Sequence, residues 1–132
     1  YQEVGLASFY KKKYYGQKTK NGEIINITEF TAAHKTLPLP SVVKITNLEN
    51  NVSLIVRVND RGPYNNEEII MVSQRVAQLL GFFKKESARV EVKILEEESR
   101  QLKFVSENIN NATSLETISA APTSSVNVTN ID

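Results

Sequence analysis

One short motif in this sequence carries a side chain that could exchange a proton with a substrate. Asn59-Asp60-Arg61-Gly62-Pro63 directly follows a run of β-forming residues, and Asp60 is one of only two aspartates in the chain. A strand that ends in a Gly-Pro turn is a rigid support that can present a carboxylate to a cleft. The alternative is an Asx turn that ends the strand and leaves Arg61 in solvent. Asp60 is therefore a candidate acid or base.

Two further groups could take part in such chemistry, and each also has an ordinary structural explanation. Asn21-Gly22 is a turn signal that places Glu23 at the start of a short extended segment. Glu23 alone is typical of a surface carboxylate. His34 is the only histidine and lies among small residues before a proline-containing connector. A lone histidine is more often a structural group than a catalyst.

Aromatic and basic residues near the start of the chain could bind a polymer. The aromatic residues could form a stacking surface for sugars or belong to the core and its rim, and they are Phe9, Tyr10, Tyr14 and Tyr15. The basic residues could contact an anionic polymer or lie in a solvated loop, and they are Lys11, Lys12, Lys13, Lys18 and Lys20.

The elements that must position these residues are mostly strands. Segments with alternating or β-branched apolar residues predict strands at Val4–Tyr10, Val42–Asn47, Ser53–Val58 and Arg89–Leu95. Turn-forming residues between the second and third of these predict a hairpin. One helix is expected, capped by Ser73 and ended by Gly81, with an apolar face of Val76, Ala77, Leu79 and Leu80. Short strands with one helix predict a small β-barrel.

Length and composition exclude several classes of protein. The chain has 132 residues, of which 40% are hydrophobic, enough for one domain that buries its own core. No apolar run approaches the roughly 20 residues of a membrane helix. With no cysteine and one histidine, disulfide scaffolds, thiolate catalysis and multi-histidine metal sites are excluded. The absence of a leading apolar segment predicts a cytosolic protein or a mature fragment.

The charge and composition change at residue 106. Residues 1–105 carry 16 basic and 12 acidic groups, a net charge of +4, which suits an anionic polymer but falls short of a nucleic-acid signature. Residues 106–132 contain no Lys or Arg and are rich in Asn, Ser, Thr and Ala. Such a segment has too few apolar residues to fold. We therefore predict a domain over residues 1–105 and a disordered linker or tail over residues 106–132.

Taken together, the motifs resemble the rare lipoprotein A family across most of the predicted domain, from about Gly5 to Leu95. In chain order they are Gly5-Leu6-Ala7-Ser8-Phe9-Tyr10, Thr19-Lys20-Asn21-Gly22-Glu23, Thr31-Ala32-Ala33-His34-Lys35-Thr36, Leu37-Pro38-Leu39-Pro40-Ser41, Val43-Lys44-Ile45-Thr46-Asn47-Leu48 and Val56-Arg57-Val58-Asn59-Asp60-Arg61-Gly62-Pro63. The resemblance implies a mainly β fold, a six-stranded double-psi β-barrel with one or two short helices.

The resemblance also implies an activity and a place. Members of the family act as endolytic lytic transglycosylases: they cleave the MurNAc–GlcNAc bond of peptidoglycan, favour peptide-poor glycan and leave 1,6-anhydromuramyl ends. They belong to the bacterial envelope, in the periplasm or on the outer membrane through a lipid-modified N-terminus. The expected partner is the glycan strand, with no nucleic acid and no metal or organic cofactor. We expect a monomer, attached to a membrane only through such an anchor.

Carried over by position, the functional residues of the family match Asp60, Glu23 and His34. A lytic transglycosylase protonates the glycosidic oxygen, and the muramyl 6-hydroxyl then attacks within the same sugar chain. One group can therefore serve first as acid and then as base, and Asp60 is assigned that role. Glu23 would stabilise positive charge or tune Asp60, and His34 would hold a carboxylate or sugar hydroxyl. Substrate binding is expected from Tyr10, Thr19, Asn59 and Arg61.

One position departs from the family pattern. The family usually reads Ile-Ile-Asp-Leu-Ser after the Gly-Pro turn, whereas this chain reads Ile69-Ile70-Met71-Val72-Ser73. Methionine neither transfers a proton nor carries charge. Either the position is dispensable because Asp60 does the work, or the protein binds glycan without cleaving it, or Met71 is an introduced substitution. The runner-up function is therefore a non-catalytic, expansin-like glycan-binding module, and a third is a structural envelope protein whose tail recruits a partner.

Overall fold

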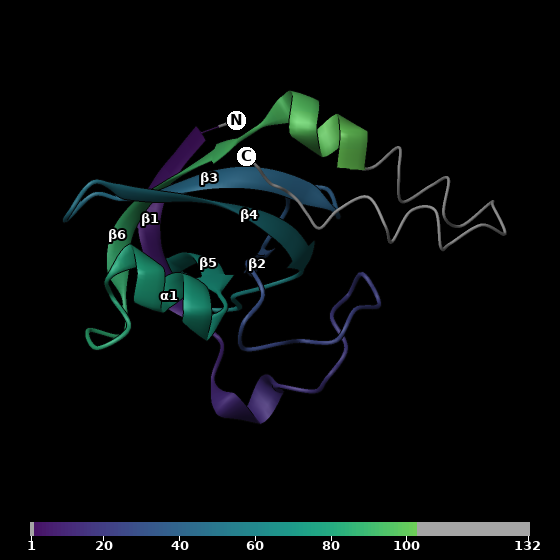
Figure 1. Cartoon of the computed structure of the whole chain (residues 1–132), viewed down its shortest axis with the longest axis horizontal. Helices are drawn as coiled ribbons and strands as arrows, with labels where there is room; N and C mark the ends of the chain where they lie inside the picture. The colour runs from purple at the N-terminus through teal and green to yellow at the C-terminus, as the bar shows by residue number, and fades with distance from the viewer. Residues whose placement is uncertain (1, 103–132) are drawn as a thin grey trace, which may run out of the picture.

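Six strands close into one barrel, in the spatial order β1-β5-β2-β4-β3-β6. Figure 1 shows the computed structural model, which describes residues 2–102. The elements in chain order are β1 (Gln2–Phe9), η1 (Lys12–Tyr14), β2 (Thr31–His34), β3 (Ser41–Asn47), β4 (Val52–Asp60), β5 (Glu68–Val72), α1 (Gln74–Leu80) and β6 (Ala88–Ile94). The predicted six-stranded barrel is confirmed, while the predicted disordered tail at residues 106–132 lies outside the described residues.

The pairing of the strands mixes two directions. β1 lies parallel to β5 and β2 lies parallel to β4, whereas the other four neighbouring pairs are antiparallel. Parallel neighbours cannot be joined by a tight turn, and here other strands separate both parallel pairs in the chain: β3 lies between β2 and β4, and β2, β3 and β4 lie between β1 and β5. This arrangement brings the last residues of β1 and β4 close to Glu68 and Met71 of β5.

The predicted hairpin is formed by β3 and β4, which pair from Ser41 with Val58 to Asn47 with Val52. Burial along β3 alternates between buried and more exposed positions, as expected for a strand with one face on the core. Asn51 in the connecting turn has φ 63°, a left-handed conformation that asparagine tolerates.

The predicted helix is α1, and its ends follow the sequence signals. The hydroxyl of Ser73 accepts a hydrogen bond from the Val76 N–H at 3.2 Å, and Gly81 adopts φ 87° after the last turn. Val76, Ala77 and Leu80 are buried, but Leu79 is 37% exposed. Including Leu79 in the buried face was wrong, since it lies about 100° around the helix from the centre of the other three.

Two apolar clusters divide the molecule. The larger fills the barrel and includes side chains from β3, β4, β6 and α1, among them Ile45, Val58 and Leu80. The smaller lies at the end of the barrel where the chain leaves β1, and it contains Tyr10, Ile25 and Ala33, with Tyr14, Tyr15 and Met71 packed on it. This second cluster anchors the long loop between η1 and β2 to the barrel.

That loop forms a small hairpin over residues 16–25. Backbone hydrogen bonds join Thr19 to Glu23 (2.7 Å) and Ile25 to Gln17 (2.8 Å), and Gly22 in the turn has φ 84°. The predicted Asn21-Gly22 turn is therefore confirmed. In Figure 1 the loop lies on the opposite side of the barrel from residues 96–102, which are helical. No helix in the described range is long and apolar enough to cross a membrane.

Candidate active site

A cavity of about 610 Å³ opens at the end of the barrel that carries the hairpin. Most of its wall comes from four stretches that are separate in sequence: residues 8–11 at the end of β1, residues 17–20 of the hairpin, residues 60–65 at the end of β4, and Glu68 and Met71 of β5. The crossed order of the strands brings these stretches together. The cavity therefore depends on the whole barrel.

Asp60 ends β4 in the wall of this cavity and is only 8% exposed. Its Oδ1 accepts hydrogen bonds from the backbone N–H groups of Lys20 (2.8 Å) and Arg61 (2.9 Å), and its Oδ2 accepts one from the Tyr10 hydroxyl (2.7 Å). A carboxylate offers about four acceptor positions. The described residues occupy three, so one position on Oδ2 is left for a substrate or a proton.

Tyr10 orients this carboxyl group. The tyrosine is 3% exposed, so little of its ring is open to a sugar. Burial, the hydrogen bond to Asp60 and the Asp60 charge all raise the pKa of Tyr10. The hydroxyl therefore stays protonated and donates to Asp60.

Thr19 and the backbone of the hairpin complete the support of Asp60. The Thr19 hydroxyl accepts hydrogen bonds from the N–H groups of Asn21 (3.2 Å) and Glu23 (3.1 Å), which fixes the turn. The same turn presents the Lys20 N–H to Asp60. Thr19 also lines the cavity, as the sequence predicts for a substrate-binding residue.

Glu23 lies outside the lining of this cavity. It forms an ion pair with Arg57, and its oxygens accept hydrogen bonds from the side chains of Asn59 (3.2 Å) and Asn21 (3.3 Å). Burial alone would raise the pKa of Glu23, but the hydrogen bond and charge of Arg57, with both asparagines, bring it below its ordinary value. Glu23 is therefore an ionised group balanced by Arg57, next to Asn59, which precedes Asp60.

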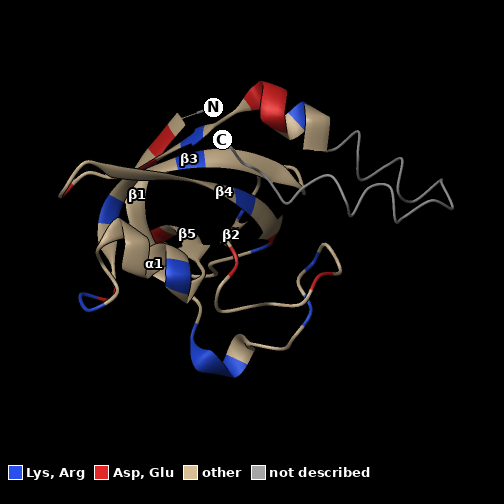
Figure 2. Ribbon diagram, viewed as in Figure 1, with Lys and Arg blue, Asp and Glu red and all other residues tan. Residues whose placement is uncertain are grey.

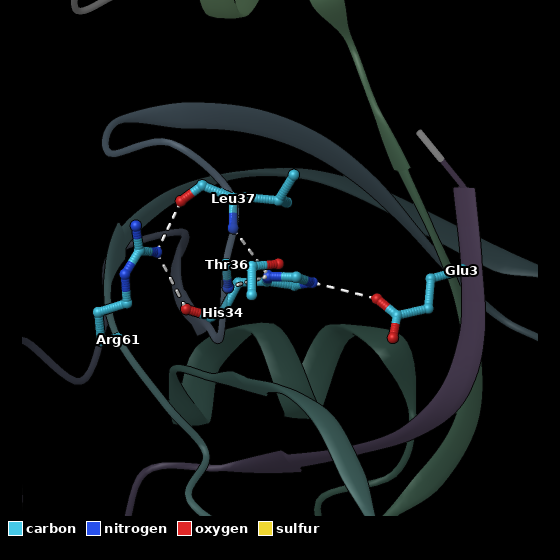
Figure 3. A network of polar contacts seen from close by, with 5 residues as sticks. All are labelled: Glu3, His34, Thr36, Leu37 and Arg61. Atoms are coloured by element: carbon cyan, nitrogen blue, oxygen red, sulfur yellow. Dashed lines mark hydrogen bonds and ion pairs between the residues drawn. The ribbon is translucent and has the colours of Figure 1, made fainter.

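His34 also lies outside the lining of the cavity and is 2% exposed. Figure 3 shows its ring with three partners: Nδ1 accepts from the N–H groups of Thr36 (3.1 Å) and Leu37 (3.2 Å), and Nε2 faces Glu3 Oε1 at 3.2 Å. Since Nδ1 accepts, the ring proton lies on Nε2 and is donated to Glu3.

The environment of His34 favours its neutral form. Burial lowers the pKa of His34, and the charges of Arg61 and Lys35 add to this, against the opposing effect of Glu3. Arg61 also donates from Nη1 to the carbonyl oxygens of His34 (3.2 Å) and Leu37 (2.6 Å) (Figure 3). This network joins the segment after β2 to the segment after β4.

The expected convergence of Asp60, Glu23 and His34 on one groove is corrected by this geometry. Of the three, Asp60 alone lines the cavity. Glu23 accepts a hydrogen bond from the side chain of Asn59, which precedes Asp60, and the backbone carbonyl of His34 accepts one from the side chain of Arg61, which follows it. Asn59 is 2% exposed and also lies outside the lining, whereas Arg61 lines it.

Sequence reasoning missed other residues in the wall. Tyr64 is 82% exposed at the mouth and follows Gly62, whose φ of 131° disfavours any other residue. Glu68 accepts a hydrogen bond from the Ser8 hydroxyl at 2.6 Å. Tyr64 directly follows the Gly-Pro turn and could have been found from that position. Glu68 carries no such signal.

The cavity has a basic rim. Besides Asp60 and Glu68, its charged lining residues are Lys11, Lys18, Lys20 and Arg61. Figure 2 shows basic residues in blue on η1 and along the loop that follows it. Part of the predicted basic cluster therefore borders the cavity. The described residues contain no group of three His, Asp or Glu side chains that could hold a metal ion.

The sequence of the whole barrel matches a known family. A family model described as "Lytic transglycolase" covers residues 2–92. The chain belongs to this family. The match spans every strand that contributes to the cavity, and the resemblance to rare lipoprotein A proteins is confirmed.

Several relatives of this lytic transglycolase domain bear the name endolytic peptidoglycan transglycosylase RlpA. The protein from Pseudomonas aeruginosa strain UCBPP-PA14 is 52% identical over 92 residues, which are 70% of this chain and 27% of that protein. The protein from Neisseria meningitidis strain MC58 is 49% identical over 70% of this chain and 38% of its own length. The protein from Rickettsia bellii is 43% identical over 94% of this chain and 56% of its own length. The matched part of the chain thus spans from about a quarter to just over half of the length of these relatives.

Among solved structures, the Streptomyces papain inhibitor SPI is similar in fold. The TM-score is 0.57 at 18% sequence identity, covering 71% of this chain and 94% of the inhibitor. At this identity the likeness supports the barrel and carries no argument about activity.

Proposed function

We propose that this domain is an endolytic lytic transglycosylase that cleaves the MurNAc–GlcNAc bond of peptidoglycan and leaves 1,6-anhydromuramyl ends. The observation that carries the proposal is the Asp60 carboxyl, held by three donors in a cavity wall with one acceptor position left. The relatives named as endolytic peptidoglycan transglycosylases support the same reaction class.

The proposed reaction needs one proton-exchanging group. Protonated Asp60 gives its proton to the glycosidic oxygen while the bond from that oxygen to the muramyl C1 breaks, leaving an oxocarbenium-like centre. The C6 hydroxyl of the same sugar forms the new bond to C1, and its proton returns to Asp60. Because the nucleophile belongs to the substrate, no protein group has to activate water. Tyr10 and the Lys20 N–H keep the carboxyl in one orientation throughout.

The basic rim suits the proposed substrate. Muramyl sugars without stem peptides carry free lactyl carboxylates, and four basic residues line the cavity against two acidic ones. Exposed Tyr64 provides an aromatic face for a sugar ring at the mouth. We extend the proposal to peptide-poor glycan and to a location in the bacterial envelope, periplasmic or on the outer membrane through a lipid anchor, as a monomer.

A second candidate is a module that binds glycan without cleaving it. The observation that favours it is Met71, an uncharged side chain in the cavity wall where the family pattern has an acid. This candidate predicts that the protein sediments with insoluble peptidoglycan and produces no new chain ends. Catalysis through Asp60 predicts new ends whatever residue occupies position 71.

Digestion of peptide-free peptidoglycan separates the two candidates. Mass spectrometry of the products should show 1,6-anhydromuramyl ends with the parent protein and none above background with Asp60→Asn. Folded parent protein that yields no such ends at several pH values, yet sediments with the polymer, would establish the binding module. Full activity of Asp60→Asn would remove Asp60 from the mechanism.

A further inference from the structure

A break in strand register places an unexpected acidic residue in the cavity. In the parallel pairing of β1 with β5, Leu6 pairs with Glu68 but Ala7 pairs with Ile70, so β5 advances two residues for one of β1. Side chains alternate between the two faces of a regular strand, and an extra residue reverses that alternation. Glu68 and Met71 are three residues apart, yet both line the cavity together with Ser8.

Glu68 is held by one of its two oxygens. Ser8 on β1 donates from its hydroxyl to Glu68 Oε1 at 2.6 Å. Within the described part of the chain, Oε2 accepts no hydrogen bond and the carboxylate forms no ion pair. The group is thus oriented by Ser8 and open to a ligand in the cavity.

Glu23, which the sequence suggests as the group that stabilises positive charge, differs from Glu68 in both charge balance and location. Its charge is balanced by Arg57, and it lies outside the lining of the cavity. A negative charge stabilises a developing positive charge best when it is fixed in place, close by and not neutralised by a neighbour. Among the described carboxylates, Asp60 and Glu68 line the cavity, and Asp60 is occupied by proton exchange in the proposed reaction.

We propose that Glu68, oriented by Ser8, is the second catalytic carboxylate of this site. Its charge stabilises the oxocarbenium-like centre at the muramyl C1 while Asp60 transfers the proton. This inference rests on the proposed lytic transglycosylase function and assigns to Glu68 the electrostatic role that the sequence assigns to Glu23. It also explains how the site could work with Met71 in its wall.

The test compares Glu68→Gln with Glu67→Gln. Glu67 is the exposed neighbour outside the cavity lining, so it is a matched control for the loss of one negative charge. With peptide-free glycan, Glu68→Gln should lower kcat about 10- to 100-fold with little change in KM, whereas Glu67→Gln should leave both near the parent values. Equal kcat values for the two variants would overturn the inference.

Ser8 provides a second, independent readout. Ser8→Ala should lower kcat by a smaller factor than Glu68→Gln, and Ser8→Thr, which keeps a hydroxyl, should recover most of the loss. Should Glu68→Gln fail to fold, as judged by thermal melting, an unchanged kcat in Ser8→Ala would by itself overturn the positioning of Glu68. If the parent forms no anhydromuramyl ends, both proposals fail. If the parent is active and Glu68→Gln is too, only this one fails.

Discussion

Asp60 and His34 are two buried polar side chains with similar surroundings, but they differ in their access to the cavity. Each is the last residue of a strand, each accepts hydrogen bonds from backbone N–H groups, and each is less than 10% exposed. Both nitrogens of the His34 ring have partners, and His34 lies outside the lining of the cavity. Asp60 lines the cavity and has one acceptor position left.

The difference shows that burial and hydrogen bonding alone do not separate a catalytic group from a structural one. A polar group whose hydrogen-bonding positions are all occupied contributes to stability, and it cannot exchange a proton with a substrate without breaking one of those hydrogen bonds. A group with one open position next to a cavity can be both oriented and reactive. We therefore assign the His34 network to the support of the Asp60 turn.

The largest effect is expected at Asp60. Asp60→Asn keeps the size of the side chain and can keep the hydrogen bonds to its Oδ1, but it removes the group that exchanges a proton. The rate of anhydromuramyl end formation should fall about 10²- to 10⁴-fold, the usual contribution of an acid–base group. Thermal melting should show a folded protein. If the rate falls only as far as the fraction of folded protein falls, Asp60 has a structural role like that of His34.

His34 should affect stability more than chemistry. His34→Ala leaves the N–H groups of Thr36 and Leu37 without their acceptor, which should lower the free energy of unfolding by about 1–3 kcal/mol in urea titrations. At temperatures where the variant is folded, it should retain far more activity than Asp60→Asn. Equal losses of kcat in the two folded variants would contradict a structural role.

The pH dependence of stability is a sharper test of the same residue. The pKa of His34 lies below its ordinary 6.5, mainly because the ring is buried. The unfolded chain therefore binds a proton more readily, and the parent should lose stability as the pH falls below about 6.5. In His34→Ala this part of the pH dependence should be absent. Urea titrations at several pH values above and below 6.5 measure it, and identical slopes in both proteins would show that His34 does not titrate in this way.

Glu23 should have a smaller effect. Its pKa lies below the ordinary 4.5 because Arg57 and two asparagines outweigh burial, so its contribution to stability is present at neutral pH and lost as the pH falls through the lowered value. Both partners of the ion pair are about a third exposed, and Glu23→Gln should cost only about 0.2–1 kcal/mol. A loss of activity as large as that of Asp60→Asn would return Glu23 to the catalytic centre.

The smallest effect is expected at the basic rim. Lys18→Gln with Lys20→Gln removes two exposed charges, while the backbone N–H that Lys20 gives to Asp60 remains. Binding to peptide-free glycan should weaken a few-fold and become less sensitive to salt, since exposed charges are screened. Sedimentation at low and high salt measures this, with Lys93→Gln as a control outside the cavity lining. An unchanged salt dependence would exclude the rim from binding.

Local signals in the sequence account for much of the fold. The alternation in β3, β4 and β6, the Asn21-Gly22 turn, and the Ser73 and Gly81 caps of α1 depend on neighbouring residues, so they can be read along the chain. The short strands β2 (Thr31–His34) and β5 (Glu68–Val72) and the helical residues 96–102 were not predicted. β2 is buried on all sides between two strands and shows no alternation.

The sequence by itself determined four of the six strands and the family to which the chain belongs, and it made Asp60 the candidate acid or base, because each of these follows from residues that are near one another in the chain. Only the tertiary structure decided that Glu23 and His34 lie outside the lining of the cavity and that Glu68 is part of it. Those outcomes depend on which strands become neighbours and on one extra residue in the β1–β5 register. A side chain's direction is fixed by pairing between distant segments, and no local pattern carries that information.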